Sequence, residues 1–354
     1  MTTQQSQTSD WQSILSASIA SVDQLATIWP INATEMHRVV ESFPMRINPY
    51  FLGLIRTPHD PIWKQVIPDL SEIQDTRGTD DPLSEDDQSP VPHLIRRYPD
   101  RVVFLVSDQC AVHCRFCLRK RNIGRATPIT PSALQAGMAY IGADTTIREV
   151  ILSGGDPFLL TDEALSSLLT DIRKCSHINS IRIHTRVPCT LPQRITEDLA
   201  RMLSAFHPLY VNTHFNHPIE ITAQSAAACM RLADSGIPLG CQTVLLKGIN
   251  DDPKVMKHLM QMLITIRVKP YYIHQLDQVR GTCHFSTPLN RGLEIMEALE
   301  GHTSGISVPR FMIDLPGGGG KVPLTPTHIT RKGKSTWLIR NFRGEVFEYP
   351  LMGG

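Results

Sequence analysis

Seven short apolar runs rich in β-branched residues recur along the chain after residue 100, and amphipathic stretches separate them. Such an alternation is typical of βα units, whose strands lie parallel in one sheet covered by helices. Because no GxGxxG motif follows the first run, the pattern favours a full or partial barrel over a doubly wound sheet. We therefore predict an α/β fold built around a barrel. The predicted strands are residues 101–107, 148–153, 180–184, 209–213, 242–246, 268–273 and 307–313.

The two ends of the chain lack this alternation. Residues 1–70 carry apolar residues at helical intervals, and Asp10 is a candidate cap for a helix that reaches Ile19. Residues 71–91 are acidic and polar, which we interpret as a solvated connector. Near the C-terminus, alternating residues predict a hairpin over 336–348. We predict three parts: a helical covering region with the acidic loop (1–90), the barrel (91–325) and a hairpin tail (326–354).

The composition limits the partners that we expect. A formal net charge of +1 and a pI near 7.7 provide no general field that would attract nucleic acid or an anionic membrane. No run of about 18 apolar residues occurs, and the N-terminal sequence lacks the basic and apolar regions of a signal peptide. We therefore expect a cytoplasmic protein that binds neither nucleic acid nor membranes.

Three cysteines, Cys110, Cys114 and Cys117, stand at CxxxCxxC spacing after the first predicted strand. A four-iron cluster usually takes four thiolates, so three cysteines leave one iron free to bind a substrate or cofactor. Structural zinc normally needs four nitrogen or sulfur ligands, and His113 is poorly placed to be the fourth. A cluster-carrying electron-transfer protein would instead be expected to ligate all four irons. We interpret the scattered cysteines as free thiols: Cys175, Cys189, Cys229, Cys241 and Cys283.

Polar residues follow several predicted strands, at the end where a barrel gathers its functional groups. In the glycine pair after the second strand, backbone carbonyls could approach a ligand without a Cβ in the way. These rim residues are Gly154, Gly155, Asp156, Pro157, Arg186, His214, His217 and Asp277.

A basic cluster of Arg115, Arg119, Lys120 and Arg121 overlaps the cysteine loop. A solvated face or an RNA-contacting patch is the ordinary interpretation of such a run. However, a guanidinium two residues past a cluster ligand is held at the rim, where it suits two parallel hydrogen bonds to a carboxylate. We therefore predict that Arg119 binds an anion or a carboxylate.

Four glycines, residues 317–320, precede Lys321. No Ser or Thr follows the lysine, and the spacing is not that of a P-loop. A flexible glycine tether could instead present Lys321 to a carbonyl group, and pyridoxal phosphate is the commonest carbonyl cofactor bound by lysine. For a lysine taken alone, a solvated surface charge is the simpler interpretation.

The cysteine loop, followed by Gly-Gly-Asp-Pro after the second strand, resembles the radical S-adenosylmethionine (SAM) superfamily. In that superfamily the open iron chelates SAM, and a glycine-rich loop meets the methionine amine; here Asp156 replaces the usual glutamate. With the motifs at residues 97–101, 214–218, 267–272 and 301–305, the sequence is similar to the lysine 2,3-aminomutase family from about Ser42 to Tyr349.

The resemblance implies a radical SAM partial (βα)6-type barrel with three cofactors: a [4Fe–4S] cluster, SAM and pyridoxal phosphate. It implies that Lys321 carries pyridoxal phosphate as a Schiff base and that Arg101, together with Arg97, meets the cofactor phosphate. The other implied cofactor residues are Cys110, Cys114 and Cys117 for the cluster and Gly154, Gly155, Asp156, His214 and Gln242 in the cofactor site.

For the substrate, the resemblance implies that Arg119 takes the carboxylate of L-lysine. Asp277 and Asp314 would grip its distant ammonium, where a relative acting on glutamate would need a neutral or cationic residue. The implied enzyme is an isomerase that moves the α-amino group to the β-carbon and gives β-lysine. A one-electron reductant of flavodoxin or ferredoxin type and a homo-oligomeric state accompany this prediction.

Some alternatives stay open. Arginine or another cationic amino acid would keep all the same motifs, and the product could supply elongation factor P modification. A SAM enzyme without pyridoxal phosphate would leave Lys321 without a role. Family members with a longer tail bind zinc through C-terminal cysteines and a cysteine near the position of Asp252. Because this chain has Asp252-Pro253 there and no cysteine after Cys283, we expect no zinc.

Overall fold

The computed structural model describes residues 11–124, 128–333 and 336–351, so the predicted Asp10 cap lies outside the described residues. The first part of the chain is helical, as predicted. Its helices are short, and several begin at side-chain caps; Asp60, for example, accepts hydrogen bonds from the backbone N–H groups of Ile62 and Trp63. The helices are α1 (Trp11–Ser16), α2 (Val22–Ala26), α3 (Ala33–Ser42), α4 (Pro49–Leu52), α5 (Pro61–Val66) and α6 (Ser71–Gln74).

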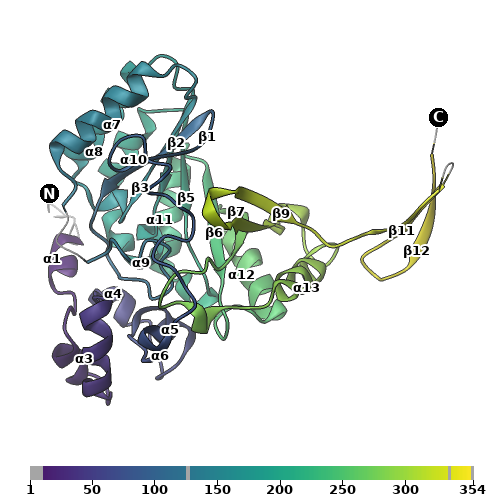
Figure 1. Cartoon of the computed structure of the whole chain (residues 1–354), viewed down its shortest axis with the longest axis horizontal. Coiled ribbons are helices and arrows are strands. Elements are labelled where there is room, and N and C mark those ends of the chain that lie inside the picture. The colour runs from purple at the N-terminus through teal and green to yellow at the C-terminus, as the bar shows by residue number, and fades with distance from the viewer. Residues whose placement is uncertain (1–10, 125–127, 334–335, 352–354) are drawn as a thin grey trace, which may run out of the picture.

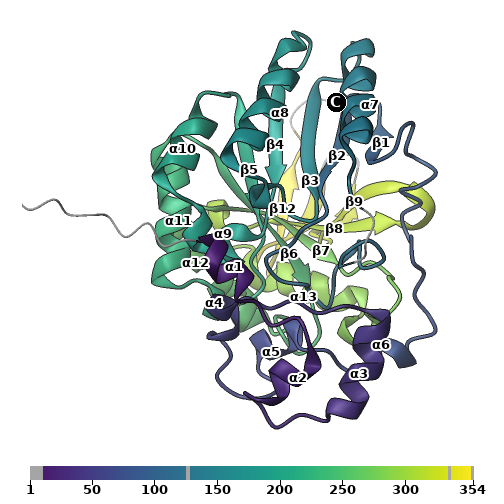
Figure 2. The ribbon, with the colours of Figure 1, turned by 90° about the vertical axis from the view of Figure 1, so that its left-hand side faces the viewer.

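A nine-stranded sheet forms the body of the molecule, with its strands hydrogen-bonded in sequence order. Strands β2 to β8 are parallel to one another, while β1 and β9 are antiparallel edge strands. The sheet curls into a nearly closed barrel (Figures 1 and 2). The strands are β1 (Leu94–Tyr98), β2 (Arg101–Ser107), β3 (Glu149–Gly154), β4 (Ser180–His184), β5 (Leu209–Thr213), β6 (Leu239–Leu245), β7 (Lys269–Gln275), β8 (Arg310–Leu315) and β9 (Gly320–Leu324).

The seven parallel strands confirm the predicted α/β barrel, and β2, β4 and β5 have the predicted bounds. The sequence did not predict the two antiparallel edge strands. Strand β9 matters most, because Lys321 lies in it, opposite Asp314 of β8. The segment that we expected to be a flexible glycine tether is therefore a three-residue 3₁₀ turn that leads directly into a strand.

Helices on the outside of the barrel connect the strands and bury its apolar outer surface. Helix α8 begins at Thr161, whose side chain accepts from the backbone N–H of Ala164, and it buries Leu165, Leu169 and Ile172. The helices are α7 (Pro131–Ala143), α8 (Asp162–Lys174), α9 (Val187–Thr190), α10 (Glu197–Ser204), α11 (Ala223–Asp234), α12 (Pro253–Thr265) and α13 (Leu289–Leu299). The 3₁₀ turns are Pro157–Leu159, Pro192–Arg194, Pro218–Glu220, Cys283–Phe285, Gly305–Ser307 and Pro316–Gly318.

The N-terminal helices anchor the cysteine loop. The backbone N–H of His113 donates to the carbonyl of Arg46 at 2.8 Å, and that of Arg115 donates to the carbonyl of Gln65 at 2.8 Å. The Asn48 amide reaches the same loop, donating to the carbonyl of Ala111 at 3.2 Å. The covering region therefore fixes the position of the three thiols.

A separate antiparallel sheet follows the barrel and projects away from it in Figure 1. Strands β11 (Thr336–Arg340) and β12 (Val346–Pro350) form the predicted hairpin, and β10 (Ile329–Lys332) adds a third strand that was not predicted. Among the described residues, no helix is long and apolar enough to cross a membrane.

Candidate active site

One cavity of about 1050 Å³ opens inside the barrel and gathers all the predicted site residues. They come from the loops after β2 and β3, from the residues just after β5 and β7, and from several strands of the sheet, although they are up to 224 positions apart in the sequence. The predicted residues that line it are Arg97, Arg101, Cys110, Cys114, Cys117, Arg119, Gly154, Gly155, Asp156, His214, Gln242, Asp277, Asp314 and Lys321.

The three cysteines of the loop are free thiols, half-buried at the cavity wall. Burial and the neighbouring Cys114 sulfur raise the pKa of Cys117 to about 11. Three thiols from one loop facing one cavity fit an iron–sulfur cluster with one iron open to that cavity. Iron must displace protons from these thiols to bind them.

The Gly154-Gly155 pair packs against the backbone of the cysteine loop. A Cβ on Gly154 would overlap the carbonyl oxygen of Ser107, and a Cβ on Gly155 would overlap that of Gln109. Gly154 also has a φ of 121°, which favours glycine. The structure therefore gives a reason for the glycines that the sequence argument missed: they let two loops of the site touch.

The carboxylate of Asp156 points into the protein. It accepts hydrogen bonds from the Thr185 hydroxyl at 2.6 Å, from the backbone N–H of Arg186 at 2.7 Å and from that of Phe158 at 3.1 Å. Burial nevertheless raises the pKa of Asp156 to about 6. This side chain ties the glycine loop after β3 to the end of β4.

The interpretation of residues 71–91 as a solvated connector was wrong for its key acids. Glu72 is 1% exposed and binds both Arg115, at 2.6 Å, and Lys120, at 2.6 Å. The connector packs on the cysteine loop because its carboxylates neutralise that loop's basic cluster. This cluster of basic residues is therefore neither a solvated face nor a nucleic-acid-binding patch.

Arg119 is held in the same way by a second buried acid of the connector. Its Nε and Nη2 donate to the two carboxylate oxygens of Glu85 at 2.9 and 2.7 Å. Its Nη1 lies 3.4 Å from the Ser153 hydroxyl. Two sides of the guanidinium are thus fixed, and Arg119 is presented at the cavity wall.

Lys321 and Asp314 face each other across β8 and β9, and the lysine Nζ forms an ion pair with Asp314 Oδ2. Asp314 is almost fully buried and also lies 3.4 Å from Arg97 Nη1 and 3.7 Å from His274 Nδ1. Tyr98 accepts a hydrogen bond from the backbone N–H of Lys321 at 2.9 Å. The amine is therefore held at the cavity by neighbouring strands.

Asp277 lines the cavity after β7. Within the described residues its carboxylate has no side-chain hydrogen bond or ion pair, unlike that of Asp314. Burial, together with the Asp314 carboxylate, raises the pKa of Asp277 to about 7. Such a carboxyl group would be stabilised in its charged form by a cation entering the cavity.

Arginines and aromatic rings line the same cavity as Lys321. The Arg101 guanidinium lies 3.8 Å from the centre of the Tyr98 ring, and Arg97 donates to Gln88 at 2.8 Å. The rings of Tyr271 and Tyr272 stack with centroids 3.8 Å apart. An amine, two arginines and aromatic surfaces around one cavity fit a phosphorylated aromatic aldehyde such as pyridoxal phosphate.

Two further predicted residues, His214 and Gln242, lie at the cavity but contact different partners. His214 Nε2 lies 2.9 Å from Asn216 Oδ1, and Gln242 Nε2 lies 3.4 Å from His184 Nε2. Sequence reasoning missed Tyr98, His184 and His274 as cavity residues. Tyr98 lies in an edge strand that was not predicted, His184 ends a predicted strand, and His274 lies one residue beyond the predicted end of another, so alternation gave no sign that they face the cavity.

Comparisons with known proteins place the chain among radical SAM enzymes. Residues 104–260 match the radical SAM superfamily, and residues 296–351 match the family described as lysine-2,3-aminomutase. A solved radical SAM methyltransferase from Sphaerobacter thermophilus is also similar, with 17% identity, a TM-score of 0.46, and coverage of 62% of this chain and 68% of that chain. The superfamily implies a [4Fe–4S] cluster and SAM.

The sequence comparisons are more specific. An L-lysine 2,3-aminomutase from Methanococcus maripaludis is 45% identical over 96% of this chain and 80% of its own length. The enzyme of the same name from Clostridium subterminale is 44% identical over 96% and 83%. A glutamate 2,3-aminomutase from Clostridioides difficile is 43% identical over 96% and 81%. The chain belongs to the lysine 2,3-aminomutase family, and it is an isomerase whose family acts on small-molecule amino acid substrates.

Proposed function

We propose that the protein converts L-lysine into β-lysine by moving its α-amino group to the β-carbon, with pyridoxal phosphate as a third cofactor. The observation that carries this proposal is the position of Lys321 in the same cavity as the three thiols. The relatives include enzymes named for lysine and for glutamate at similar identity, so the substrate must be argued from the cavity itself.

Two carboxylates favour a cationic substrate. Asp277 and Asp314 both line the cavity, and burial, together with the Asp314 carboxylate, raises the pKa of Asp277 to about 7; this supports a site that would be stabilised by added positive charge. A glutamate side chain there would add a third carboxylate to the pair and be repelled. The distal ammonium of lysine can take the position beside Asp314 that the Lys321 ammonium occupies.

The opposite end of the substrate would be bound by Arg119. The Glu85 carboxylate orients the guanidinium, and the Nη1 edge, 3.4 Å from Ser153, remains available to a ligand carboxylate. A fixed guanidinium loses little freedom when it binds, so it also fixes the substrate's α-carbon. Arg119 and the two aspartates would thus hold lysine at both ends.

We assign different residues of the cavity to each of the three proposed cofactors. Cys110, Cys114 and Cys117 would hold the cluster, and the loop around Gly155 would contact SAM. Lys321 would bind pyridoxal phosphate, with the phosphate near Arg97 and Arg101; His214 and Gln242 would complete the cofactor site. When bound, the cluster and SAM supply one-electron chemistry that removes a substrate hydrogen atom, and pyridoxal phosphate supplies the carbonyl that carries the migrating nitrogen.

The chain itself would exclude water and guide the substrate. The described part of the covering region, residues 11–90, packs on the cysteine loop through buried ion pairs, such as Glu72 with Arg115, and so closes one side of the cavity. The division into residues 1–90, 91–325 and 326–354 stays a prediction. So do a flavodoxin- or ferredoxin-type reductant and a homo-oligomeric state.

The test is anaerobic turnover of the reconstituted enzyme with SAM, pyridoxal phosphate and a reductant. Lysine, arginine, ornithine and glutamate would be compared by product mass, with Lys321→Ala as the inactive control. We expect a β-amino acid from lysine and none from glutamate. Turnover of arginine in place of lysine would contradict the substrate, and a Lys321→Ala variant that retains the absorbance of bound pyridoxal phosphate would contradict the cofactor assignment.

A further inference from the structure

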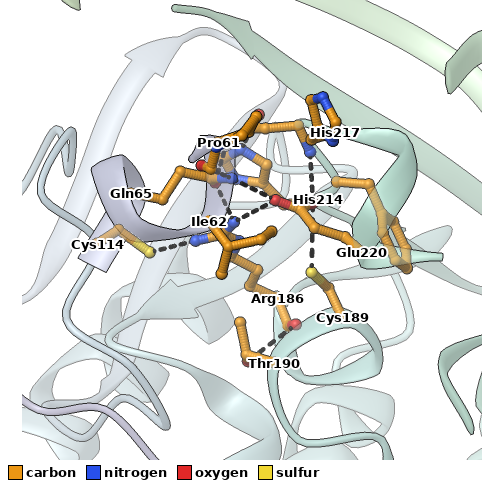
Figure 3. A network of polar contacts seen from close by, with 12 residues as sticks. Pro61, Ile62, Gln65, Cys114, Arg186, Cys189, Thr190, His214, His217 and Glu220 are labelled. Carbon is orange, nitrogen blue, oxygen red and sulfur yellow. Dashed lines mark hydrogen bonds and ion pairs between the residues drawn. The ribbon is translucent and has the colours of Figure 1, made fainter. Parts of the chain in front are cut away.

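A buried polar network lies behind the cysteine loop, with Arg186 at its centre (Figure 3). The side chain of Arg186 is 9% exposed, and its Nη1 donates to the Sγ of Cys114 at 2.8 Å. Its Nη2 donates to Gln65 Oε1 at 2.5 Å and to Glu220 Oε1 at 3.2 Å. One guanidinium thus joins a thiol of the proposed cluster to a buried carboxylate.

The acid that balances this guanidinium is itself fixed. Glu220 is fully buried; its Oε1 accepts from the Gln65 amide at 2.6 Å, and its Oε2 accepts from the backbone N–H of Asn216 at 2.7 Å. The Asn216 amide also donates to Gln65 Oε1 at 3.0 Å. Every carboxylate oxygen of Glu220 therefore has a partner, which keeps it from moving toward the thiol.

The backbone of Arg186 is held from the other side. Its N–H donates to the Asp156 carboxylate at 2.7 Å, and its carbonyl accepts from the Thr190 hydroxyl at 3.1 Å. Asp156 belongs to the glycine loop, so the proposed SAM loop and the proposed cluster loop share this arginine. Arg186 is thereby held by hydrogen bonds at its backbone as well as at its guanidinium.

The contact is also selective among the three thiols. Within the described residues, Cys114 accepts a hydrogen bond from a charged side chain, and no such bond is found at Cys110 or Cys117. Hydrogen bonds to the ligand sulfurs and nearby charges set the reduction potential of an iron–sulfur cluster. A buried arginine that donates to one of the three cysteines can therefore do more than stabilise the fold.

We propose that Arg186 is a positioning residue of the iron–sulfur centre: it holds the Cys114 thiolate by a charged hydrogen bond and raises the reduction potential of the cluster. A one-electron donor of flavodoxin or ferredoxin type would supply the electron to the bound cluster, and Arg186 would neither give nor take an electron or a proton. Its positive charge lies nearer to the sulfur than the negative charge of Glu220, so the pair stabilises the added electron.

The inference rests on the proposed assignment of the cluster to Cys110, Cys114 and Cys117, and it does not depend on which amino acid is the substrate. A Cys114→Ala variant tests that assignment separately. If this variant binds a complete cluster with the wild-type paramagnetic resonance signal, the cluster assignment fails, whatever the Arg186 variants show.

The experiment is a redox titration of the reconstituted holoenzyme without SAM, followed by electron paramagnetic resonance, with iron and sulfide content measured in parallel. Arg186→Met should shift the midpoint to a more negative potential. We expect about a tenfold weaker affinity for the electron, which corresponds to about 59 mV for a one-electron couple. Arg186→Lys, which keeps the charge but loses the forked contact, should show a smaller shift in the same direction.

Arg194→Met is the matched control. Arg194 is also buried, at 1% exposed, and donates to the carbonyls of Phe158 at 2.7 Å and Leu160 at 3.0 Å; in the described part of the chain it makes no hydrogen bond to a cysteine of the loop. Its loss should lower the melting temperature and leave the potential unchanged.

An unchanged midpoint and resonance signal in a folded Arg186→Met enzyme with a complete cluster would overturn the inference. If that variant does not fold, Arg186→Met/Glu220→Gln removes both buried charges, and Arg186→Lys keeps both; an unchanged midpoint in whichever of these folds has the same meaning. A variant that melts like the wild type but retains less iron than Arg194→Met supports the positioning of Cys114.

Discussion

Replacing Asp277 with asparagine should make the cofactor-free protein more stable at alkaline pH, although Asp277 is a proposed substrate residue. Its carboxylate has no hydrogen bond or ion pair within the described part of the chain, and burial beside Asp314 raises its pKa from an ordinary value of 3.8 to about 7. The ionised Asp277 carboxylate therefore destabilises the folded state unless a cation binds beside it.

The sign and size follow from this shift. Because the folded state binds the proton more tightly than the unfolded state, stability falls as the pH rises from about 4 to about 7. At about 1.36 kcal/mol for each pKa unit, the penalty of ionised Asp277 reaches about 4 kcal/mol at pH 8 and about 2 kcal/mol at pH 5. These are upper values, because the group keeps some contact with solvent.

The assay is urea unfolding of the wild type and Asp277→Asn at pH 5 and pH 8, with the exposed Asp87→Asn as control. We expect Asp277→Asn to be more stable than the wild type, by a larger margin at pH 8 than at pH 5, and to bind lysine more weakly. Equal stability at pH 8, or the same margin at both pH values, would refute the reasoning.

Three further predictions concern other parts of the site. Asp314→Asn should lower kcat/KM for lysine about 10- to 100-fold, since a charge-assisted hydrogen bond contributes about 1.5–3 kcal/mol. Unchanged steady-state kinetics would contradict the proposed binding of the lysine ammonium by Asp314. Glu72→Gln leaves two buried cations unpaired and should lower the free energy of unfolding by about 3–5 kcal/mol in urea, whereas a loss under about 1 kcal/mol would count against it. Gly155→Ala should weaken equilibrium SAM binding, while Gly305→Ala, where a Cβ meets nothing within 4 Å, should not. Equal SAM affinities of the two variants would argue that the packing of Gly155 on the cysteine loop does not support SAM binding.

The parallel strands could be predicted because each is a continuous apolar run between helices. Strand β9 could not, because glycines next to Lys321 suggest mobility when they are read without a partner strand. In its pairing with β8, Lys321 lies opposite Asp314, seven residues earlier, and the glycines between them give no sign of that register.

The buried charges of the site were harder to predict from the sequence than the strands. Glu72 and Glu85 stand in an acidic, polar stretch that looks solvated, and their partners Arg115 and Arg119 follow 43 and 34 residues later. Burial of such acids depends on a counterion brought close by the fold, which composition does not reveal. For the same reason Arg186 was recognised as a rim residue but not as a partner of Cys114.

The most direct test of the proposed function follows the migrating nitrogen. Anaerobic enzyme with SAM, pyridoxal phosphate and a reductant would be given L-lysine labelled with ¹⁵N at its α-amino group, and the product would be examined by NMR. The proposed reaction predicts β-lysine with the label on the β-carbon. A product that keeps the label on the α-carbon, or one whose β-amino group is unlabelled, would contradict it.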